Sequence, residues 1–573
     1  MALYELHRAV RQGDLARVNE LLGRASDPSD INRPDDHRRT PIMYALVAPP
    51  ERLDVLRTLI RHGAWIVQEA VSLALNDLQK LNVLLDAGAD ILYTTADGYD
   101  ALINAACRTD ARSNLQLLDI LRFLIGKGVA LRGMSEWGES AVRVFSRRGR
   151  FDAVQLLLEA GANPDDVKLT PLIKAVAFGT LADVATEIDK GANLEEREHW
   201  GRTAWLVAIQ TGDIAKAKLL LERGADRDAR GRCERPPLFY AIEDKRIPML
   251  NWLLELGINV EQADEFGTTP LRIAVECCNE EAVEILLRAG ANVHSESRTG
   301  TALEYARTRN IAVKLLEAGA DPKNLRYAGR RAILGYPPQP DRDLLVSVSR
   351  DADFASHRSR RPGVSNPEEL TNPFWVGMIR SGVNAYCAGQ TFEAGDHSAG
   401  GPAPVWCAER FGQSLTFLPD GRVVQVAGEH EDYYDPDFCI YNDVFVHSAA
   451  GGITIYGYPE SVFPPTDFHT ATLVGPFIYL IGSLGYPEGR RDGVTPVYRL
   501  DTTTFEIVPL ETTGEVPGWI HGHRAVQSGP SEIRISGGKV WFLKDGAAAV
   551  APNATVFILD VGTRVWRAEP GGT

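Results

Sequence analysis

The sequence has few cysteines, and none of them show the spacing of a zinc site. Its seven cysteines are an odd number in 573 residues, and no two form a C-x-x-C pair. A disulfide framework and a zinc site are therefore disfavoured, and a reducing environment is expected. The chain also lacks an apolar run long enough to cross a bilayer and an apolar signal-peptide core after Met1. We expect a cytoplasmic protein that makes no contact with a membrane.

Motifs of catalysis are missing as well. The chain contains no G-x-S-x-G elbow, no phosphate-binding loop and no H-E-x-x-H helix. We therefore expect that the protein is not an enzyme and that it holds no cofactor and no metal.

Positive charge is scarce. The net charge is −15, and residues 340–573 hold 17 Lys and Arg against 28 Asp and Glu. Binding to a nucleic-acid backbone needs clustered Lys and Arg, so a nucleic-acid partner is not expected. The acidic balance favours a basic protein partner, with improved solubility as the plain alternative.

A short motif recurs through the first three-fifths of the chain. Leucine-rich segments end in a glycine that is often followed by alanine, as in LLERGAD and LLRAGAN, and three consecutive steps between these glycines measure 33 residues. A fixed period in this range indicates a solenoid of stacked helical units, in which the glycine ends a helix in a left-handed conformation. The glycines are Gly63, Gly88, Gly128, Gly161, Gly191, Gly224, Gly257, Gly290 and Gly319.

A second motif lies about twenty residues before several of these glycines. It reads Thr-Pro-Ile at 40–42, Thr-Pro-Leu at 170–172 and 269–271, and Pro-Pro-Leu at 236–238. Threonine caps helix N-termini, and proline is tolerated in the first helical turn. Together the two motifs resemble the ankyrin repeat over about ten units, some of them degenerate. The resemblance implies an α-solenoid over residues 1–325 that binds a protein through its concave face and its hairpin fingers. Residues 67–93 are short for a unit and 94–131 carry an insertion, so we expect irregular stacking near 65–130.

Residues 326–372 break this pattern. They contain Tyr-Pro-Pro-Gln-Pro at 336–340 and an arginine cluster at 358–361. Proline without periodicity predicts a linker or an extended wrap.

The remaining residues, 373–573, are rich in short strands. Alternating runs at 422–426, 477–481 and 540–543 predict strands, and the glycines that close them, Gly428, Gly482 and Gly537, lie 54 and 55 residues apart. This pattern resembles the kelch repeat, one four-stranded propeller blade per unit, over residues 411–567. Only three units are visible, and residues 373–410 are a candidate for one more irregular blade. The expected fold is thus an α + β multidomain chain, an ankyrin-repeat α-solenoid followed by an all-β kelch-like partial propeller. Its open sheet needs cover from the solenoid, a partner, or self-association with a second copy.

Two polar clusters in this half are candidate sites. The first is an acidic loop that suits contact with Lys or Arg of a partner; a solvated loop and a hard-cation site are the alternatives. Its residues are Glu429, Glu431, Asp432, Tyr433, Tyr434, Asp435 and Asp437. The second is the set His469, His521 and His523. A structural role, with ring nitrogens bonded to backbone, is favoured over convergence on a metal.

Three aromatic residues complete the candidate binding residues. Trp137, Trp200 and Phe266 each precede the glycine at a finger tip. If exposed in a line, they are anchors for a protein partner; the alternative is that each ring packs on a neighbouring unit. The expected function is a protein–protein interaction scaffold, for which the resemblance to bacterial ankyrin proteins implies a toxin-neutralising (immunity) or regulatory role. The rival hypothesis is an enzyme or metal-dependent module in the C-terminal half with the repeats as its targeting arm.

Overall fold

The computed structural model describes residues 5–24, 28–35, 38–49, 52–108, 111, 114–320, 327–337, 339–392, 404–432 and 435–569. By its internal contacts the chain divides into two compact units, Met1–Ala302 and Leu303–Thr573. Among the described residues, no helix has both the length and the apolar character that a membrane span requires.

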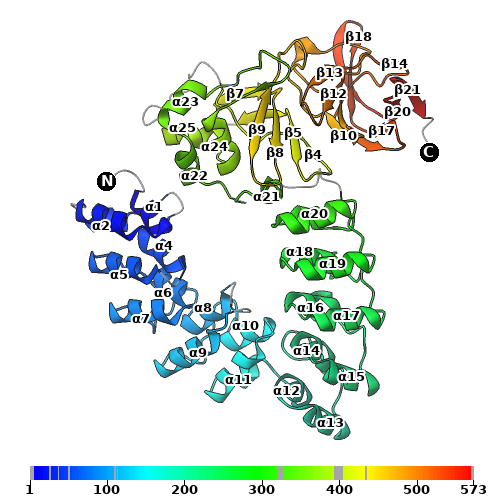
Figure 1. Cartoon of the computed structure of the whole chain (residues 1–573). Coiled ribbons are helices and arrows are strands. Elements are labelled where there is room, and N and C mark those ends of the chain that lie inside the picture. The colour runs from blue at the N-terminus through cyan, green and yellow to red at the C-terminus, as the bar shows by residue number, and fades with distance from the viewer. Residues whose placement is uncertain are drawn as a thin grey trace. The chain divides into compact units, whose positions relative to one another are not determined.

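The first unit is built from antiparallel helix pairs that follow one another along the chain (Figure 1). The pairs are α1 (Glu5–Gln12) with α2 (Leu15–Arg24), α4 (Pro41–Val47) with α5 (Leu53–Arg61), α6 (Gln68–Ala74) with α7 (Leu78–Asp86), α8 (Ala101–Cys107) with α9 (Leu117–Gly126), α10 (Ala141–Arg147) with α11 (Phe151–Glu159), α12 (Pro171–Phe178) with α13 (Leu181–Asp189), α14 (Ala204–Thr211) with α15 (Ile214–Glu222), α16 (Pro237–Glu243) with α17 (Ile247–Glu255), and α18 (Pro270–Glu276) with α19 (Glu280–Arg288). A short helix, α3 (Pro28–Asn32), lies between the first two pairs.

The predicted helix ends are confirmed. All nine repeat glycines have a positive φ, between 78° at Gly257 and 107° at Gly161, which an L-residue adopts only with strain. The N-terminus of the first helix in a pair is capped as predicted. The Thr170 hydroxyl accepts a hydrogen bond from the N–H of Ile173 at 3.2 Å and so caps α12. In the leucine pairs before Gly224 and Gly290, Leu220 and Leu286 are fully buried, whereas Leu221 and Leu287 are partly buried.

Successive pairs are joined by a recurring polar contact. A side chain from one pair donates a hydrogen bond to a carbonyl near the C-terminal end of the first helix in the preceding pair, where carbonyls lack helical partners and cations interact well with the helix dipole. These bonds run from Arg52 to Arg11 O (2.6 Å), Lys80 to Leu46 O (2.7 Å), Arg108 to Ser72 O (3.0 Å), Arg148 to Cys107 O (2.7 Å), Lys216 to Val176 O (2.9 Å), Arg246 to Gln210 O (3.2 Å) and Asn279 to Ile242 O (2.9 Å).

The series has one gap, and it lies where we did not expect irregularity. Helix α6 packs against both α4 and α8, so the stack continues through residues 65–130. The break comes one pair later, because no bond in the series joins the sixth pair to α10. Instead, two side chains of the seventh pair reach the C-terminal end of α10, and they belong to the candidate site described below.

The second unit begins with helices, where the sequence predicted the end of the solenoid, a linker and part of a blade. They are the 3-10 helix η4 (Ala302–Tyr305), α20 (Arg309–Glu317), α21 (Tyr327–Ile333), α22 (Arg342–Val348), α23 (Asp351–His357), α24 (Pro373–Ser381) and α25 (Ala385–Phe392). The interpretation of residues 373–410 as a further blade is wrong for 373–392. Asn372 caps α24, and the buried side chains of Phe374, Trp375 and Met378 follow at helical spacing.

Three sheets, each with four antiparallel strands paired in chain order, make up most of the second unit, and none of them closes on itself. The first contains β4 (Ser414–Phe417), β5 (Val423–Val426), β8 (Val444–His447) and β9 (Ile453–Gly457), with β3 (Glu368–Glu369) at its edge. The second contains β10 (Thr470–Val474), β11 (Phe477–Ile481), β12 (Val497–Asp501) and β13 (Ile507–Pro509). The third contains β16 (Arg524–Gln527), β17 (Glu532–Ser536), β20 (Val556–Asp560) and β21 (Val565–Glu569), with β14 (Thr513–Gly514) paired to β21. The predicted strands are therefore confirmed, and β10 packs against both β4 and β16.

Two hairpins interrupt this pattern at equivalent points. Strands β6 (Glu429–Asp432) and β7 (Asp435–Ile440) lie between β5 and β8, whereas β18 (Lys539–Lys544) and β19 (Ala547–Pro552) lie between β17 and β20 and form a sheet with β15 (Trp519–His521). Two glycines, the strand-closing Gly482 and Gly538 next to Gly537, allow close approach of the backbone of β15. A Cβ at Gly482 would lie 2.3 Å from Ile520 O, and one at Gly538 would lie 2.6 Å from His521 O.

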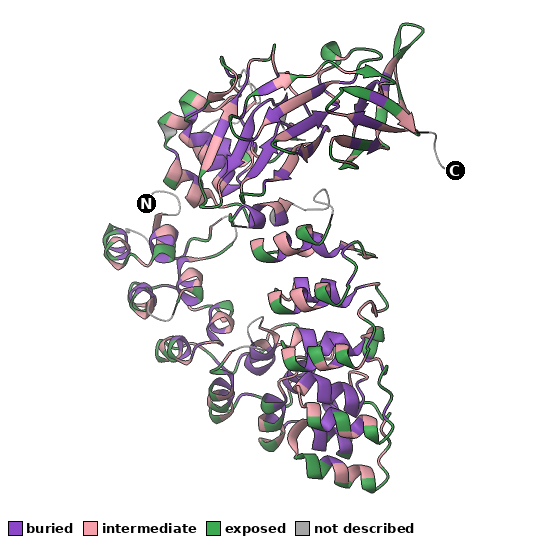
Figure 2. Cartoon of the chain, turned by 45° about the vertical axis from the view of Figure 1, so that its right-hand side comes forward, coloured by how far each residue is buried: buried purple, intermediate pink, exposed green. Residues whose placement is uncertain are grey.

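The two ends of the sheet stack are covered within the chain. Side chains of α22, α24 and α25 pack with Tyr441, Phe445 and Ile455 on the first sheet. The other end is the face of the third sheet that carries the ion pairs Arg567–Glu532 (2.9 Å) and Arg534–Glu569 (3.2 Å), while Ile533 and Ile535 point inward. Figure 2 shows the buried central strands and the largely exposed β18–β19 hairpin. The chain's own helices therefore cover the first sheet, and the outer face of the third sheet carries charged side chains; self-association through the sheets stays a prediction.

Candidate protein-binding surface

The loops between helix pairs form fingers along one edge of the first unit. We number each finger by the pair that it precedes and call the whole row the finger edge. Neighbouring fingers are joined by a backbone hydrogen bond from an N–H of the later finger to a carbonyl at the tip of the earlier one. These bonds are Glu136 N to Asp97 O (3.0 Å), His199 N to Val167 O (3.1 Å), Arg232 N to Trp200 O (3.1 Å), Glu265 N to Cys233 O (3.2 Å) and Arg298 N to Phe266 O (3.3 Å).

This ladder is interrupted once, between the fifth and sixth fingers. The sixth finger forms a short 3-10 helix, Pro164–Asp166, capped by Asn163. Within residues 114–320, which the structure describes without a gap, no equivalent bond reaches the carbonyl of Trp137. The finger edge therefore consists of two segments. One holds the fourth and fifth fingers, and the other runs from the sixth finger to Arg298.

Arginines reinforce the second segment. The Arg197 guanidinium donates to the carbonyls of Gly201 and Arg230, and Arg230 in turn donates to Glu234 O (3.1 Å) and Ala263 O (2.8 Å). Arg197 and Arg230 occupy equivalent positions in the seventh and eighth fingers, so this second bond series runs parallel to the backbone ladder.

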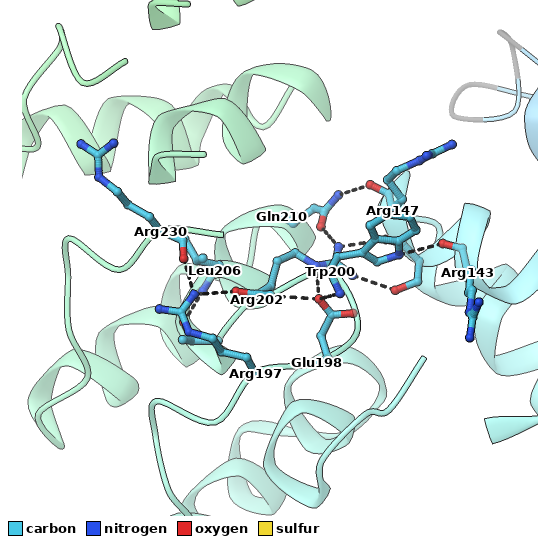
Figure 3. A network of polar contacts seen from close by, with 12 residues as sticks. Arg143, Arg147, Arg197, Glu198, Trp200, Arg202, Leu206, Gln210 and Arg230 are labelled. Carbon is cyan, nitrogen blue, oxygen red and sulfur yellow. Dashed lines mark hydrogen bonds and ion pairs between the residues drawn. The ribbon is translucent and has the colours of Figure 1, made fainter. Parts of the chain in front are cut away.

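A buried polar network links the seventh pair directly to the fifth (Figure 3). Arg202, only 1% exposed, forms an ion pair with Glu198 at 2.9 Å and donates to Ser146 O (2.9 Å) and Ser146 Oγ (2.7 Å). It also contacts the Gln210 side-chain carbonyl, while Gln210 Nε2 donates to Arg147 O (3.2 Å). Ser146 and Arg147 lie at the C-terminal end of α10. The seventh pair therefore supplies the contact that the sixth pair does not make.

Trp200 belongs to this interface. Its indole N–H donates to Arg143 O in α10 at 3.0 Å. Its ring is partly buried, with the guanidinium carbons of Arg147 and Arg232 at 5.1 Å and 5.7 Å from the ring centroid. The structure therefore shows that Trp200 packs between helix pairs of the first unit. This was the alternative to its role as an exposed anchor.

Phe266 and Trp137 are more accessible. Phe266 is 46% exposed, and the Arg298 guanidinium carbon lies 5.9 Å from its ring centroid. Trp137 is 76% exposed, next to Met134 at 40%. Among the described residues, Trp137 has no ring or cation–π contact with a neighbouring finger. The three predicted aromatics therefore do not form one continuous line, because the ladder ends at Trp137.

The predicted acidic loop lies at the β6–β7 hairpin. Burial raises the pKa of Glu429 to about 7, helped by the nearby Asp467 and Glu431 carboxylates. Glu431 is exposed. Tyr433 and Tyr434, and the side chains of Asp432, Asp435 and Asp437, lie outside what the structure describes. A partner contact at this loop stays a prediction.

Two of the predicted histidines bond to hydroxyl groups of neighbouring strands. His469 Nε2 contacts Ser414 Oγ at 2.8 Å, and His523 Nε2 contacts Thr470 Oγ1 at 2.9 Å. Both rings are buried, so their role at the junctions between sheets is structural, with hydroxyl partners where we expected backbone. Across the described ranges, no three His, Cys, Asp or Glu side chains are grouped as ligands for a metal.

Sequence reasoning missed the break in the finger edge and the Arg202 network. A signal for the break was present, because Val167-Lys168, after the turn-forming Asn163-Pro164-Asp165-Asp166, stands where the fifth, seventh and ninth fingers have their aromatic–glycine pair. No local signal identifies the partners of Arg202, since Ser146 belongs to a helix pair that is not adjacent.

Comparison with known families identifies the repeats. The ankyrin repeat family matches residues 172–264, as three copies, and residues 266–298. No curated protein matches the chain. Ankyrin repeats support a role in protein–protein interaction in general, and the strand-rich second unit matches no family of kelch repeats.

Proposed function

We propose that this chain, in which residues 172–298 are ankyrin repeats, binds a protein partner through its finger edge, with Trp137 as the principal anchor. The proposal assigns the chain no catalytic step. A toxin-neutralising role and a regulatory role would both use such a surface, and the identity of the captured partner separates them.

The observation that carries the proposal is the exposure of Trp137. The ring is 76% exposed at the tip of a finger whose backbone is held to the fourth finger by the bond between Glu136 N and Asp97 O. A large ring on a fixed loop loses little conformational freedom on binding, and desolvated tryptophans are the most common anchors of interfaces. Met134 adds exposed apolar surface beside it.

The proposal gives the second unit a secondary role in binding. We infer that its three sheets are kelch-like blades, because each has four antiparallel strands paired in chain order and because β10, a first strand, lies beside the first strands β4 and β16. The acidic β6–β7 hairpin remains a candidate second contact for a basic partner.

Capture of partners from the native host tests the proposal. The full-length chain serves as bait, next to the variants Trp137→Ala and Trp65→Ala. Trp65 is also well exposed, at 61%, but it lies in the short third finger, between α5 and α6, which no bond of the ladder joins to the fourth finger in the part of the chain that the structure describes; it is therefore a matched control for the loss of a surface tryptophan at the same edge. We expect Trp65→Ala to retain the captured protein and Trp137→Ala to lose it. Equal capture by both variants would remove Trp137, and with it the proposed surface, from recognition.

A further inference from the structure

The fingers of the second segment share one way of covering an aromatic tip. The Arg232 guanidinium lies over Trp200 with its carbon 5.7 Å from the ring centroid, and that of Arg298 lies over Phe266 at 5.9 Å. In both cases the arginine is the residue whose N–H bonds to the tip carbonyl. The backbone bond between fingers therefore positions the arginine so that its guanidinium lies over the ring.

Trp137 is the tip aromatic for which the following finger supplies no arginine. The sixth finger turns into the 3-10 helix Pro164–Asp166, and the ladder bond is not formed. The ring that is left uncovered is much more exposed than Phe266, at 76% against 46%. The position over Trp137 that an arginine occupies at the other two tips is therefore open.

Two exposed carboxylates lie at the finger tips next to this open ring. Glu136 and Asp97 are both exposed, and the backbone bond between them holds the two residues side by side at adjacent tips. Neither carboxylate forms an ion pair within the described part of the chain. Arg143 also reaches this tip, where it donates to Gly138 O (2.6 Å) and contacts Met134 Sδ (3.7 Å), but it is engaged with the sixth finger as well: it donates to Asp166 O (2.9 Å) and lies 3.8 Å from the Asp166 carboxylate, which offsets its charge.

We propose that Trp137, with Asp97 and Glu136, accepts an arginine side chain of the protein partner. The inference rests on the proposed function and adds the chemistry of the partner. A guanidinium over the indole gains the cation–π attraction that the chain itself uses at Trp200 and Phe266, and the exposed carboxylates of Asp97 and Glu136, at the same two joined tips, supply acceptors for its N–H groups. An acidic partner side chain would meet like charge, and an aliphatic one would leave the carboxylates without a new interaction.

Fluorine NMR of the full-length chain labelled with 5-fluorotryptophan tests this directly. The Trp137 resonance is assigned as the one missing from Trp137→Phe. The probes are a short peptide of alternating glycine and arginine and the same peptide with citrulline, which keeps the shape of arginine but not its charge. We expect the arginine peptide to shift the Trp137 resonance in a saturable manner. We expect the citrulline peptide to bind roughly tenfold more weakly, on the scale of one cation–π contact with added ion pairs.

The matched variant is Asp97→Asn combined with Glu136→Gln, which removes both charges and leaves Trp137 in place. We expect the arginine peptide to bind this variant several-fold more weakly, and we expect its affinity to lose most of its dependence on salt. Equal shifts with arginine and citrulline, or no shift of Trp137 with either peptide, would overturn the arginine proposal. The capture experiment with Trp137→Ala is independent of these peptides, so failure of the partner chemistry and failure of the proposed function are distinguishable.

Discussion

The two segments of the finger edge use the same tip motif with opposite results. In the second segment Trp200 and Phe266 are covered by arginines from the next finger, and Trp200 also bonds to α10. In the first segment Trp137 occupies the equivalent place and is left 76% exposed. The difference shows that exposure of a tip residue depends on the finger that follows it. In the proposal above, an aromatic–glycine tip is a binding anchor where the ladder stops.

The largest expected effect on stability comes from breaking the polar network that joins the seventh pair to α10. Arg202→Ala would leave Glu198 buried without its cation, and breaking a buried pair costs about 3–5 kcal/mol of unfolding free energy. Thermal or chemical unfolding of the full chain measures this. Arg197→Ala is the control, because that side chain also donates to carbonyls but is exposed; we expect a loss below about 1 kcal/mol. Equal losses of unfolding free energy in Arg202→Ala and Arg197→Ala would mean that the network does not hold the two segments together.

The next effect in size is at Trp200. Trp200→Ala removes a partly buried ring and its hydrogen bond to Arg143 O, so we expect a loss of about 2–3 kcal/mol. Trp200→Phe keeps most of the apolar contact and should recover part of that loss. An unchanged midpoint of unfolding in Trp200→Ala would remove the distinction between the packed tip and the exposed one.

A smaller effect is expected where arginine covers a tip ring. Arg298→Ala uncovers Phe266, and an exposed cation–π contact contributes about 0.5–1 kcal/mol. Hydrogen exchange of amides in the ninth finger would report the loosening more sensitively than global unfolding. Exchange rates that do not change would show that the guanidinium over the ring contributes nothing to holding the tip.

The smallest effect on stability is expected at Trp137. Trp137→Ala removes a ring that is 76% exposed and makes no aromatic or cation–π contact in the described chain, so the free energy of unfolding should change by less than about 0.5 kcal/mol. Differential scanning calorimetry beside Trp200→Ala gives the comparison in one experiment. A loss of stability comparable to that of Trp200→Ala would show that the Trp137 ring packs against the rest of the protein, and it would contradict the contrast between the two tips.

Much of the fold could be predicted because it follows from local rules. The repeat glycines end helices through their own φ, and the run at 477–481 is a strand, β11, with the predicted limits. Residues 373–392 were misread, because their aromatic composition suggested a strand while Asn372-Pro373 and the spacing of Phe374, Trp375 and Met378 specify a helix. The identity of the tip residues was predictable, but their exposure was not. Coverage of Trp200 depends on Arg232 in another finger and on Arg143 in a pair that is not adjacent.

The central claim is that Trp137 anchors a protein partner, and the dissociation constant of the captured partner tests it most directly. Calorimetric titration of the partner into the full-length chain, Trp137→Ala and Trp65→Ala gives the three values under one condition. The account predicts an unchanged value for Trp65→Ala and a loss of roughly 30-fold or more for Trp137→Ala, as for an anchor contributing about 2 kcal/mol or more. The same dissociation constant for Trp137→Ala and the unaltered chain would contradict it.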